Sequence, residues 1–262
     1  MISFSQFLAD LTNPALAFLP KALLVAVLSA LVCGVIGTHV VLRGMAFIGD
    51  AVAHAVFPGL AIAFALQFSV IAGGALAGAV VALLIALFSQ RRRVKEDTII
   101  GIFFAAAFAL GLVVISKVQG YTASLNSFLF GSITGVSNED IIFSAVVGAV
   151  VIVAVATLHK EIVAVSVDRE TAAAMGIRVL LIDVVLYLAV TAAVVMSVRT
   201  VGNILVLALL ITPAATARLW TDRLVVMMIL SAVIGMVGSF VGVYVSLSLI
   251  HISEPTRPLY IS

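Results

Sequence analysis

Residues 21–66 read KALLVAVLSALVCGVIGTHVVLRGMAFIGDAVAHAVFPGLAIAFAL, two long apolar runs that meet at Arg43. Each run has the roughly 20 residues that a helix needs to cross about 30 Å of hydrocarbon. In lipid the backbone polar groups must be satisfied within the segment, so runs of this kind fold as helices. The stretch therefore predicts two membrane-spanning helices, Lys21–Leu42 and Met45–Leu66.

The rest of the chain has the same character. It is 64% hydrophobic and 10% charged, whereas a soluble domain has about 25% charged residues. We therefore expect an all-α fold, a polytopic transmembrane helical bundle of about eight spans. The other six expected spans are Phe68–Phe88, Thr98–Ser116, Asp140–Leu158, Val179–Val198, Gly202–Leu219 and Leu224–Ser246.

Composition and motifs exclude several classes of function. The sequence has no Walker-type phosphate loop, so it predicts no ATPase site of that kind in this chain. A net charge of +2 is too small to indicate nucleic-acid binding. Cys33 is the single cysteine, which excludes an internal disulfide and a multi-cysteine metal site.

The basic residues predict the orientation. With eight spans, ten of the 14 Lys and Arg residues fall in loops on one side of the membrane. The positive-inside rule makes that side cytoplasmic and puts the N-terminus outside. The loops concerned contain Arg43, residues 91–95, residues 160–178, and Arg218 with Arg223.

Asp50 and His54 are the only ionisable residues between Arg43 and Arg91, and the second span places them near mid-depth. At i and i+4 their side chains project from one face of a helix. A charge at the bilayer centre costs at least about 2.5–3.5 kcal/mol, so such residues are typically functional. Carboxylate and imidazole bind divalent transition metals, which need about four to six ligands. We expect a metal site here; the alternative is a buried Asp–His contact that satisfies two polar groups.

The remaining ligands have several candidate sources. Pro58 predicts a helix break, and it leaves the His54 carbonyl without its helical hydrogen bond; an ordinary proline kink is the alternative. Glu96 and Asp97 begin the fourth span at its cytoplasmic edge and are possible ligands along the path. Stabilisation by the helix dipole or an ion pair is the other interpretation of these two carboxylates. A second copy of the chain and water are further sources.

Other positions predict packing and interface roles. Gly73, Gly74 and Gly78 predict close approach of the third span to a neighbour. His39, near the cytoplasmic end of the first span, is expected at the membrane interface. Residues 120–135 are too polar for a span and predict a re-entrant or external hairpin.

Residues 159–178, HKEIVAVSVDRETAAAMGIR, form a polar loop on the positive side. Asp168 is suited to a helix N-cap and Gly176 to a helix end, which predicts a short amphipathic helix between them. Such a helix suits the docking of a soluble partner. A surface helix without a partner is the alternative.

The composition changes after Ser246 to LSLIHISEPTRPLYIS. Residues 247–257 correspond to a direct translation of a common transposase sequencing adapter, and residues 258–262 fit its barcode and continuation. We therefore expect residues 1–246 to form the transmembrane domain. Residues 247–262 are expected to be a non-native, adapter-derived tail in place of a further native segment. The same codons in genomic DNA would contradict this expectation.

Four stretches resemble the permease subunits of bacterial zinc, manganese and iron(II) ABC importers, the metal-ABC-3 family. The combination of GDAVAH, the proline four residues later and the PAATA run is specific, and the similarity continues in order to Ser246. Two departures are visible. Gly44 stands where family members often carry a second basic residue, and family chains usually run through another apolar segment after Tyr244. The stretches are GTHVVLRGMAFIGDAVAHAVFPGLAIAF from Gly37, KEDTIIGIFF from Lys95, SFLFGSI from Ser127, and TVGNILVLALLITPAATARL from Thr200.

The resemblance implies the permease domain of an importer in the bacterial cytoplasmic membrane, with zinc, manganese or iron(II) as cargo and no permanent cofactor. Implied partners are a cytoplasmic ATPase subunit that holds the ATP, a second permease (another copy or a related chain) and an extracytoplasmic metal-binding protein. Asp50 and His54 match the family's metal site in the translocation path. One loop matches the coupling helix that docks on the ATPase: Asp168, Arg169, Glu170, Thr171, Ala172, Ala173, Ala174, Met175 and Gly176.

A proton-coupled secondary metal transporter is the alternative function, because such proteins also use intramembrane Asp–His pairs. It would need no soluble partner, so the helix expected over residues 168–176 argues against it. An intramembrane protease is disfavoured, because the sequence contains neither HExxH nor a recognisable serine–histidine arrangement.

Overall fold

The computed structural model describes residues 4–45, 47–90, 94–116, 131 and 135–253. Within these ranges every regular element is a helix, which confirms the all-α class. All eight expected spans are helical. Their bounds are α2 (Phe18–Leu42), α3 (Ile48–Ala65), α4 (Val70–Ser89), α5 (Glu96–Ile115), α7 (Asn138–Thr157), α10 (Val179–Val201), α11 (Asn203–Arg218) and α12 (Leu224–Ser253).

These eight helices differ in length. Among the described residues, α2, α4, α5, α7, α10 and α12 are long and apolar enough to cross a membrane. The helices α3 and α11 are shorter, with 18 and 16 residues. The count of eight full spans is therefore approximate. Short elements complete the chain: α1 (Phe4–Asp10), the 3-10 turn η1 (Pro14–Leu16), α8 (His159–Val167) and α9 (Arg169–Ala174).

The second span starts later than its apolar run because α2 ends in a glycine cap. Gly44 has a φ of +68°, in the left-handed region that favours glycine. The amide of Gly44 donates to the Val41 carbonyl and that of Met45 to the Val40 carbonyl, which closes a Schellman motif. This turn uses residues that the sequence pattern assigned to the span, so α3 begins only at Ile48.

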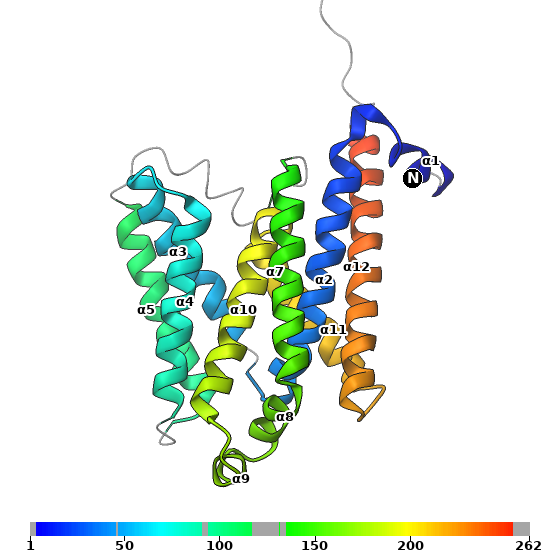
Figure 1. Ribbon diagram of the computed structural model, residues 1–262. Helices are drawn as coiled ribbons and strands as arrows, with labels where there is room; N and C mark the ends of the chain where they lie inside the picture. The colour runs from blue at the N-terminus through cyan, green and yellow to red at the C-terminus, as the bar shows by residue number, and fades with distance from the viewer. Residues whose placement is uncertain (1–3, 46, 91–93, 117–130, 132–134, 254–262) are drawn as a thin grey trace, which may run out of the picture.

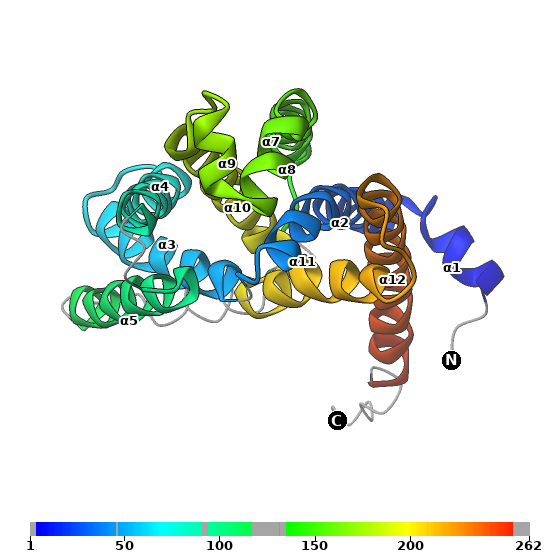
Figure 2. The same cartoon turned by 90° about the horizontal axis from the view of Figure 1, so that it is seen from below.

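Helix α10 lies at the centre of the bundle and contacts α2, α3, α4, α7 and α11 (Figures 1 and 2). On one side of it, α3 packs against α4 and α5; on the other, α2 packs against α11 and α12.

Small residues allow the close approach of α3 and α4. A Cβ added to Gly73 would lie 2.6 Å from the Gly59 carbonyl oxygen, which confirms the predicted packing role of Gly73.

The outer faces of the bundle are apolar. Helix α12 exposes a ridge of branched side chains at every fourth position, an arrangement that suits lipid and not water. The ridge consists of Val225, Ile229, Val233, Val237, Val241 and Val245.

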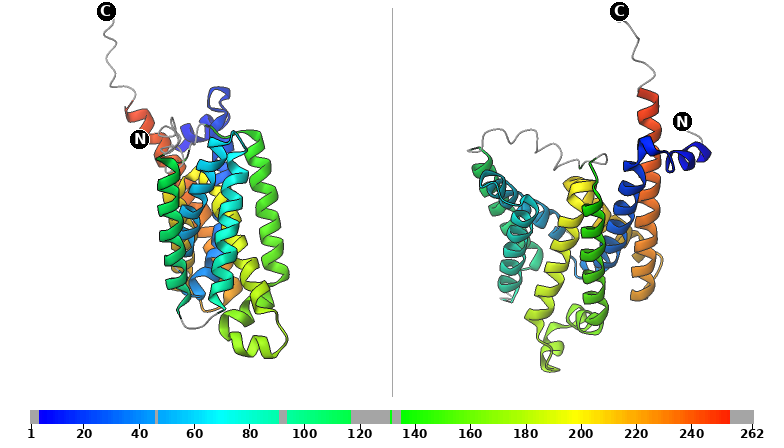
Figure 3. Two further views of the ribbon diagram at one scale, coloured as in Figure 1. Left: turned by 90° about the vertical axis from the view of Figure 1, so that its left-hand side faces the viewer. Right: turned by 45° about the horizontal axis from the view of Figure 1, so that its top comes forward.

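The chain crosses between the two ends of the bundle repeatedly, and α8 and α9 project at the end opposite to α1 (Figures 1 and 3).

Two expectations fall partly or wholly beyond what can be described. Helix α12 continues past Ser246 to Ser253, and the rest of the expected tail lies outside the described residues. The hairpin expected over residues 120–135 is also outside them, apart from Gly131 and Gly135.

Candidate metal site and charge network

Asp50 and His54 lie in the first two turns of α3. Asp50 is the third residue of the helix, where the positive end of the helix dipole stabilises a carboxylate. The His54 Nδ1 atom lies 2.9 Å from the main-chain oxygen of Asp50 and 3.2 Å from its Oδ1. The side chains are therefore brought together as the i, i+4 spacing predicts.

The partner of Nδ1 assigns the chemistry of the imidazole. A carbonyl oxygen only accepts hydrogen bonds, so Nδ1 donates in its contact with the Asp50 main chain. In the neutral ring the lone pair then resides on Nε2. Nε2 is consequently the His54 atom available to a metal ion, and the Asp50 main chain orients the ring for it.

Two phenylalanines of α5 hold the same ring from the side. The His54 ring centroid lies 4.9 Å from that of Phe104 and 5.2 Å from that of Phe108, both edge-on. The two phenyl rings are nearly parallel to each other. This aromatic cage leaves the imidazole little rotational freedom.

Asp50 and His54 are only partly buried, and the two side chains do not by themselves supply a full set of metal ligands. The side chains are 25% exposed for His54 and 33% for Asp50. Over the described part of the chain, no three His, Cys, Asp or Glu side chains are grouped closely enough to hold a metal ion. Helix α3 is continuous across Pro58, so the predicted helix break is not observed. Pro58 still lacks the N–H that would donate to the His54 carbonyl.

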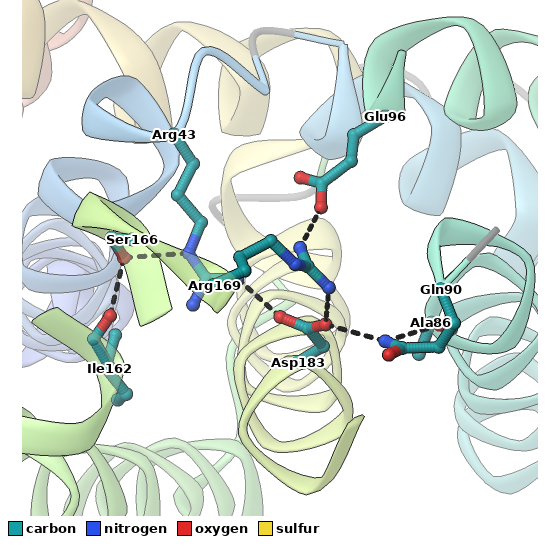
Figure 4. A network of polar contacts seen from close by, with 8 residues as sticks. All are labelled: Arg43, Ala86, Gln90, Glu96, Ile162, Ser166, Arg169 and Asp183. Atoms are coloured by element: carbon teal, nitrogen blue, oxygen red, sulfur yellow. Dashed lines mark hydrogen bonds and ion pairs between the residues drawn. The ribbon is translucent and has the colours of Figure 1, made fainter. Parts of the chain in front are cut away.

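A second polar cluster lies where several helices meet at the end of the bundle that carries α8 and α9 (Figure 4). Its centre is Asp183 of α10, a carboxylate with no exposed surface. Arg43 Nη1, just after α2, donates to Asp183 Oδ1 at 2.7 Å, and Gln90 Nε2, just after α4, donates to Oδ2 at 3.0 Å. Arg169 of α9 pairs with both Asp183 and Glu96. Two guanidinium groups thus balance two carboxylates, and the buried Asp183 is paired as a buried charge requires.

Of the two possible path ligands, Glu96 and Asp97, only Glu96 belongs to this network. Glu96 forms an ion pair with Arg169, the arrangement that the ion-pair interpretation describes. Asp97 Oδ1 accepts a long 3.5 Å hydrogen bond from the Phe47 amide, just before α3. Neither carboxylate lies with Asp50 and His54 in a described metal group, and a ligand role for them stays a prediction.

The predicted short helix is α9. Asp168 Oδ1 accepts hydrogen bonds from the amides of Glu170 and Thr171, which confirms the predicted N-cap. Gly176 has a φ of +85° and ends the helix as predicted. Ala172 is buried and anchors α9 to the bundle. The sequence analysis predicted one short helix in this loop and did not predict α8, which is a separate helix before α9.

His39 packs near the start of α8. His39 is buried, with its ring 6.0 Å from that of His159, the first residue of α8. The expected place of His39 at the membrane interface stays a prediction.

Sequence reasoning missed the centre of the charge network. Asp183 is a carboxylate inside the expected span Val179–Val198, and that fact alone marks an intramembrane ionisable residue. Its partners were not predictable, because Arg43, Gln90 and Arg169 come from three separate parts of the chain.

Comparison with known proteins identifies the family. Residues 15–259 match the ABC 3 transport family. The chain belongs to this family. It is 41% identical over 230 residues to the manganese transport system membrane protein MntC of Halalkalibacterium halodurans, which covers 88% of this chain and 79% of MntC. It is 34% identical over 229 residues to a probable iron transport system membrane protein of Haemophilus influenzae, covering 87% of this chain and 81% of that one.

A solved structure supports the same assignment. A chain of PsaBC from Streptococcus pneumoniae, determined in complex with a Fab, superposes with a TM-score of 0.82 at 34% identity. The match covers 94% of this chain and 88% of that one. As an ABC 3 family member with several apolar helices, the chain is a multi-pass membrane permease.

Proposed function

We propose that this chain is the permease subunit of an ATP-binding-cassette importer that carries manganese, zinc or iron(II) into the bacterial cytoplasm. The observation that carries the proposal is the Asp50–His54 pair of α3, with Nδ1 engaged by the chain itself and Nε2 left for a metal. Relatives named for manganese and iron transport support this class of cargo.

The partial exposure of the pair supports a place on the translocation path. Polar side chains in a membrane protein face a water-filled path or another protein surface, and not lipid tails. Two ligands from one chain form a weak site, and the remaining ligands come from a second permease copy, from the His54 carbonyl or from water. Weak binding suits transport, because a complete coordination cage would hold the ion too tightly.

The ATP that drives transport is hydrolysed on separate cytoplasmic subunits, which dock on the loop containing α9. The side chains of Val167 and Met175 flank α9 and are 82% and 72% exposed. Exposed apolar residues on either side of a capped helix are suited to insertion into a groove of a soluble partner. On the other face of the membrane, a metal-binding protein delivers the ion.

Metal uptake by cells that carry the complete transport operon tests the proposal. Asp50→Ala and His54→Ala are expected to abolish uptake of Mn²⁺, Zn²⁺ or Fe²⁺, whichever the wild type accumulates. Asp222→Ala serves as the control, because Asp222 is an exposed carboxylate between α11 and α12. Normal uptake in both α3 variants would remove the pair from the path.

Reconstitution separates the proposal from a proton-coupled transporter. The purified permease in proteoliposomes is expected to move metal only when the ATPase subunits and ATP are present. Metal movement driven by a proton gradient without the ATPase would establish the secondary-transporter alternative.

A further inference from the structure

The charge network connects the loop proposed to dock the ATPase with the helix that cages His54. Arg169 is the first residue of α9, and its guanidinium lies between Glu96 and Asp183 (Figure 4). Glu96 is the first residue of α5, the helix that carries Phe104 and Phe108. Residues in one helix move together, so a displacement at Glu96 is carried along α5 to the two aromatic rings.

The distances suit such a connection. Glu96 and Phe104 are eight residues apart, or about 12 Å along a helix. Phe104 and Phe108 then contact the His54 ring directly. Helix α5 packs against α3 and α4. The Arg169–Glu96 ion pair links α5 to α9 in addition to these packing contacts.

The other end of the network is fixed. Asp183 is fully buried on the central helix α10 and is held by Arg43 and Gln90 as well as by Arg169. Arg43 Nε also donates to Ser166 of α8 at 2.9 Å. Movement of α9 is therefore resisted at Asp183, and Glu96 is the network carboxylate that lies on the metal-site side.

We propose that Arg169 and Glu96 are positioning residues whose ion pair transmits movement of α9 through α5 to the aromatic cage around His54. The proposal rests on the proposed function and adds a specific route from the ATPase to the metal ligand. Arg169 steers α5, and α5 sets the orientation of the imidazole. Neither residue contacts the ion.

Glu96→Gln is the sharpest variant, because it removes the charge of the ion pair that joins α9 to α5 and leaves the Arg43 and Arg169 contacts with Asp183 in place. The measurement is the number of metal ions transported per ATP hydrolysed, in proteoliposomes with the ATPase and the metal-binding protein. We expect this ratio to fall about tenfold, as for loss of a charge-assisted hydrogen bond. ATPase co-purification and equilibrium Mn²⁺ binding to the permease should be unchanged.

Arg169→Gln and the double variant test whether the two residues act through one contact. The double variant should transport as many ions per ATP as the poorer single variant, since coupled residues are not additive. Arg223→Gln removes an exposed cytoplasmic charge between α11 and α12 and should retain the wild-type ratio.

Other outcomes overturn the inference. A wild-type transport ratio in Glu96→Gln would show that α9 acts on the metal site by another route. Weakened equilibrium Mn²⁺ binding in Glu96→Gln but not in Arg169→Gln would make Glu96 a path ligand. If the wild-type complex moved no metal, the proposed function itself would fail; metal transport that needs Asp50 but not Glu96 would overturn only the positioning role.

Discussion

At the scale of single residues, His54 is oriented by its own helix and by a neighbouring one. The Asp50 main chain engages Nδ1, and the rings of Phe104 and Phe108 restrict rotation. A metal ligand whose direction is set before the ion arrives loses little conformational entropy on binding. In the proposed metal site the pair would form one arm of the coordination sphere, with Nε2 as the His54 ligand atom.

Substitutions that mimic one ring nitrogen at a time test the assignment of Nε2. The amide of glutamine reaches about as far as Nε2, and that of asparagine about as far as Nδ1. His54→Gln should therefore retain measurable Mn²⁺ binding, whereas His54→Asn should behave like His54→Ala. Equilibrium Mn²⁺ binding to the purified permease distinguishes them. Stronger binding by the asparagine variant would assign the metal to Nδ1.

The aromatic cage makes a separate prediction. Phe104→Leu keeps an apolar side chain but removes one edge-on contact with His54, so we expect Mn²⁺ affinity to fall about threefold, within the range for aromatic pairs. Phe103→Leu is the matched control on the same helix, because Phe103 packs against Phe88. Equal effects of the two variants would mean that any change in α5 packing disturbs the site.

At the scale of elements, the contact between α3 and α4 depends on two glycines. A Cβ on Gly59 would overlap the Gly73 carbonyl oxygen and a side chain of α4. Gly59→Ala should destabilise the permease by about 1–3 kcal/mol, as overpacking does. Thermal unfolding in detergent measures this, and Gly238→Ala is the control because open space surrounds that position. Equal stability of the two variants would mean that α3 and α4 separate without cost.

The cap of α9 provides a prediction about partner docking. Asp168→Ala removes the acceptor for the first amides of α9 and should cost about 1 kcal/mol, whereas Asp168→Asn retains an N-cap. The alanine variant is expected to co-purify with less ATPase subunit than the asparagine variant. Equal loss in both would indicate that the ATPase binds the Asp168 charge and not a preformed helix.

The elements also show what the sequence could predict. Long apolar runs located all eight large helices, because burial in lipid leaves the backbone no alternative to a helix. The predicted start of α3 was too early, because the residues of the turn that follows α2 at Gly44 are as apolar as the span itself. Asp50 and His54 were found because their spacing is local. The Asp183 network was missed because it joins residues that only the tertiary fold brings together.

At the scale of the whole molecule, α3 lies between α5 and α11 along one side of the bundle (Figure 2). The side chains of Asp50 and His54 are a quarter to a third exposed. Lipid tails offer no hydrogen bonds to such groups. A second copy of the chain that covers this side would shield the pair and would contribute a second carboxylate and a second imidazole.

This arrangement predicts one metal site for every two chains. Purified permease should bind one Mn²⁺ ion per two copies, counted by equilibrium dialysis and elemental analysis, and bound Mn²⁺ should raise the unfolding midpoint. In dimers reassembled at random with an Asp50→Ala/His54→Ala chain, the number of sites should fall as the square of the wild-type fraction, because each site needs two intact chains. A linear decrease would instead mean that each chain completes its own site. The remaining ligands would then come from water and the carbonyl that Pro58 leaves without a helical hydrogen bond.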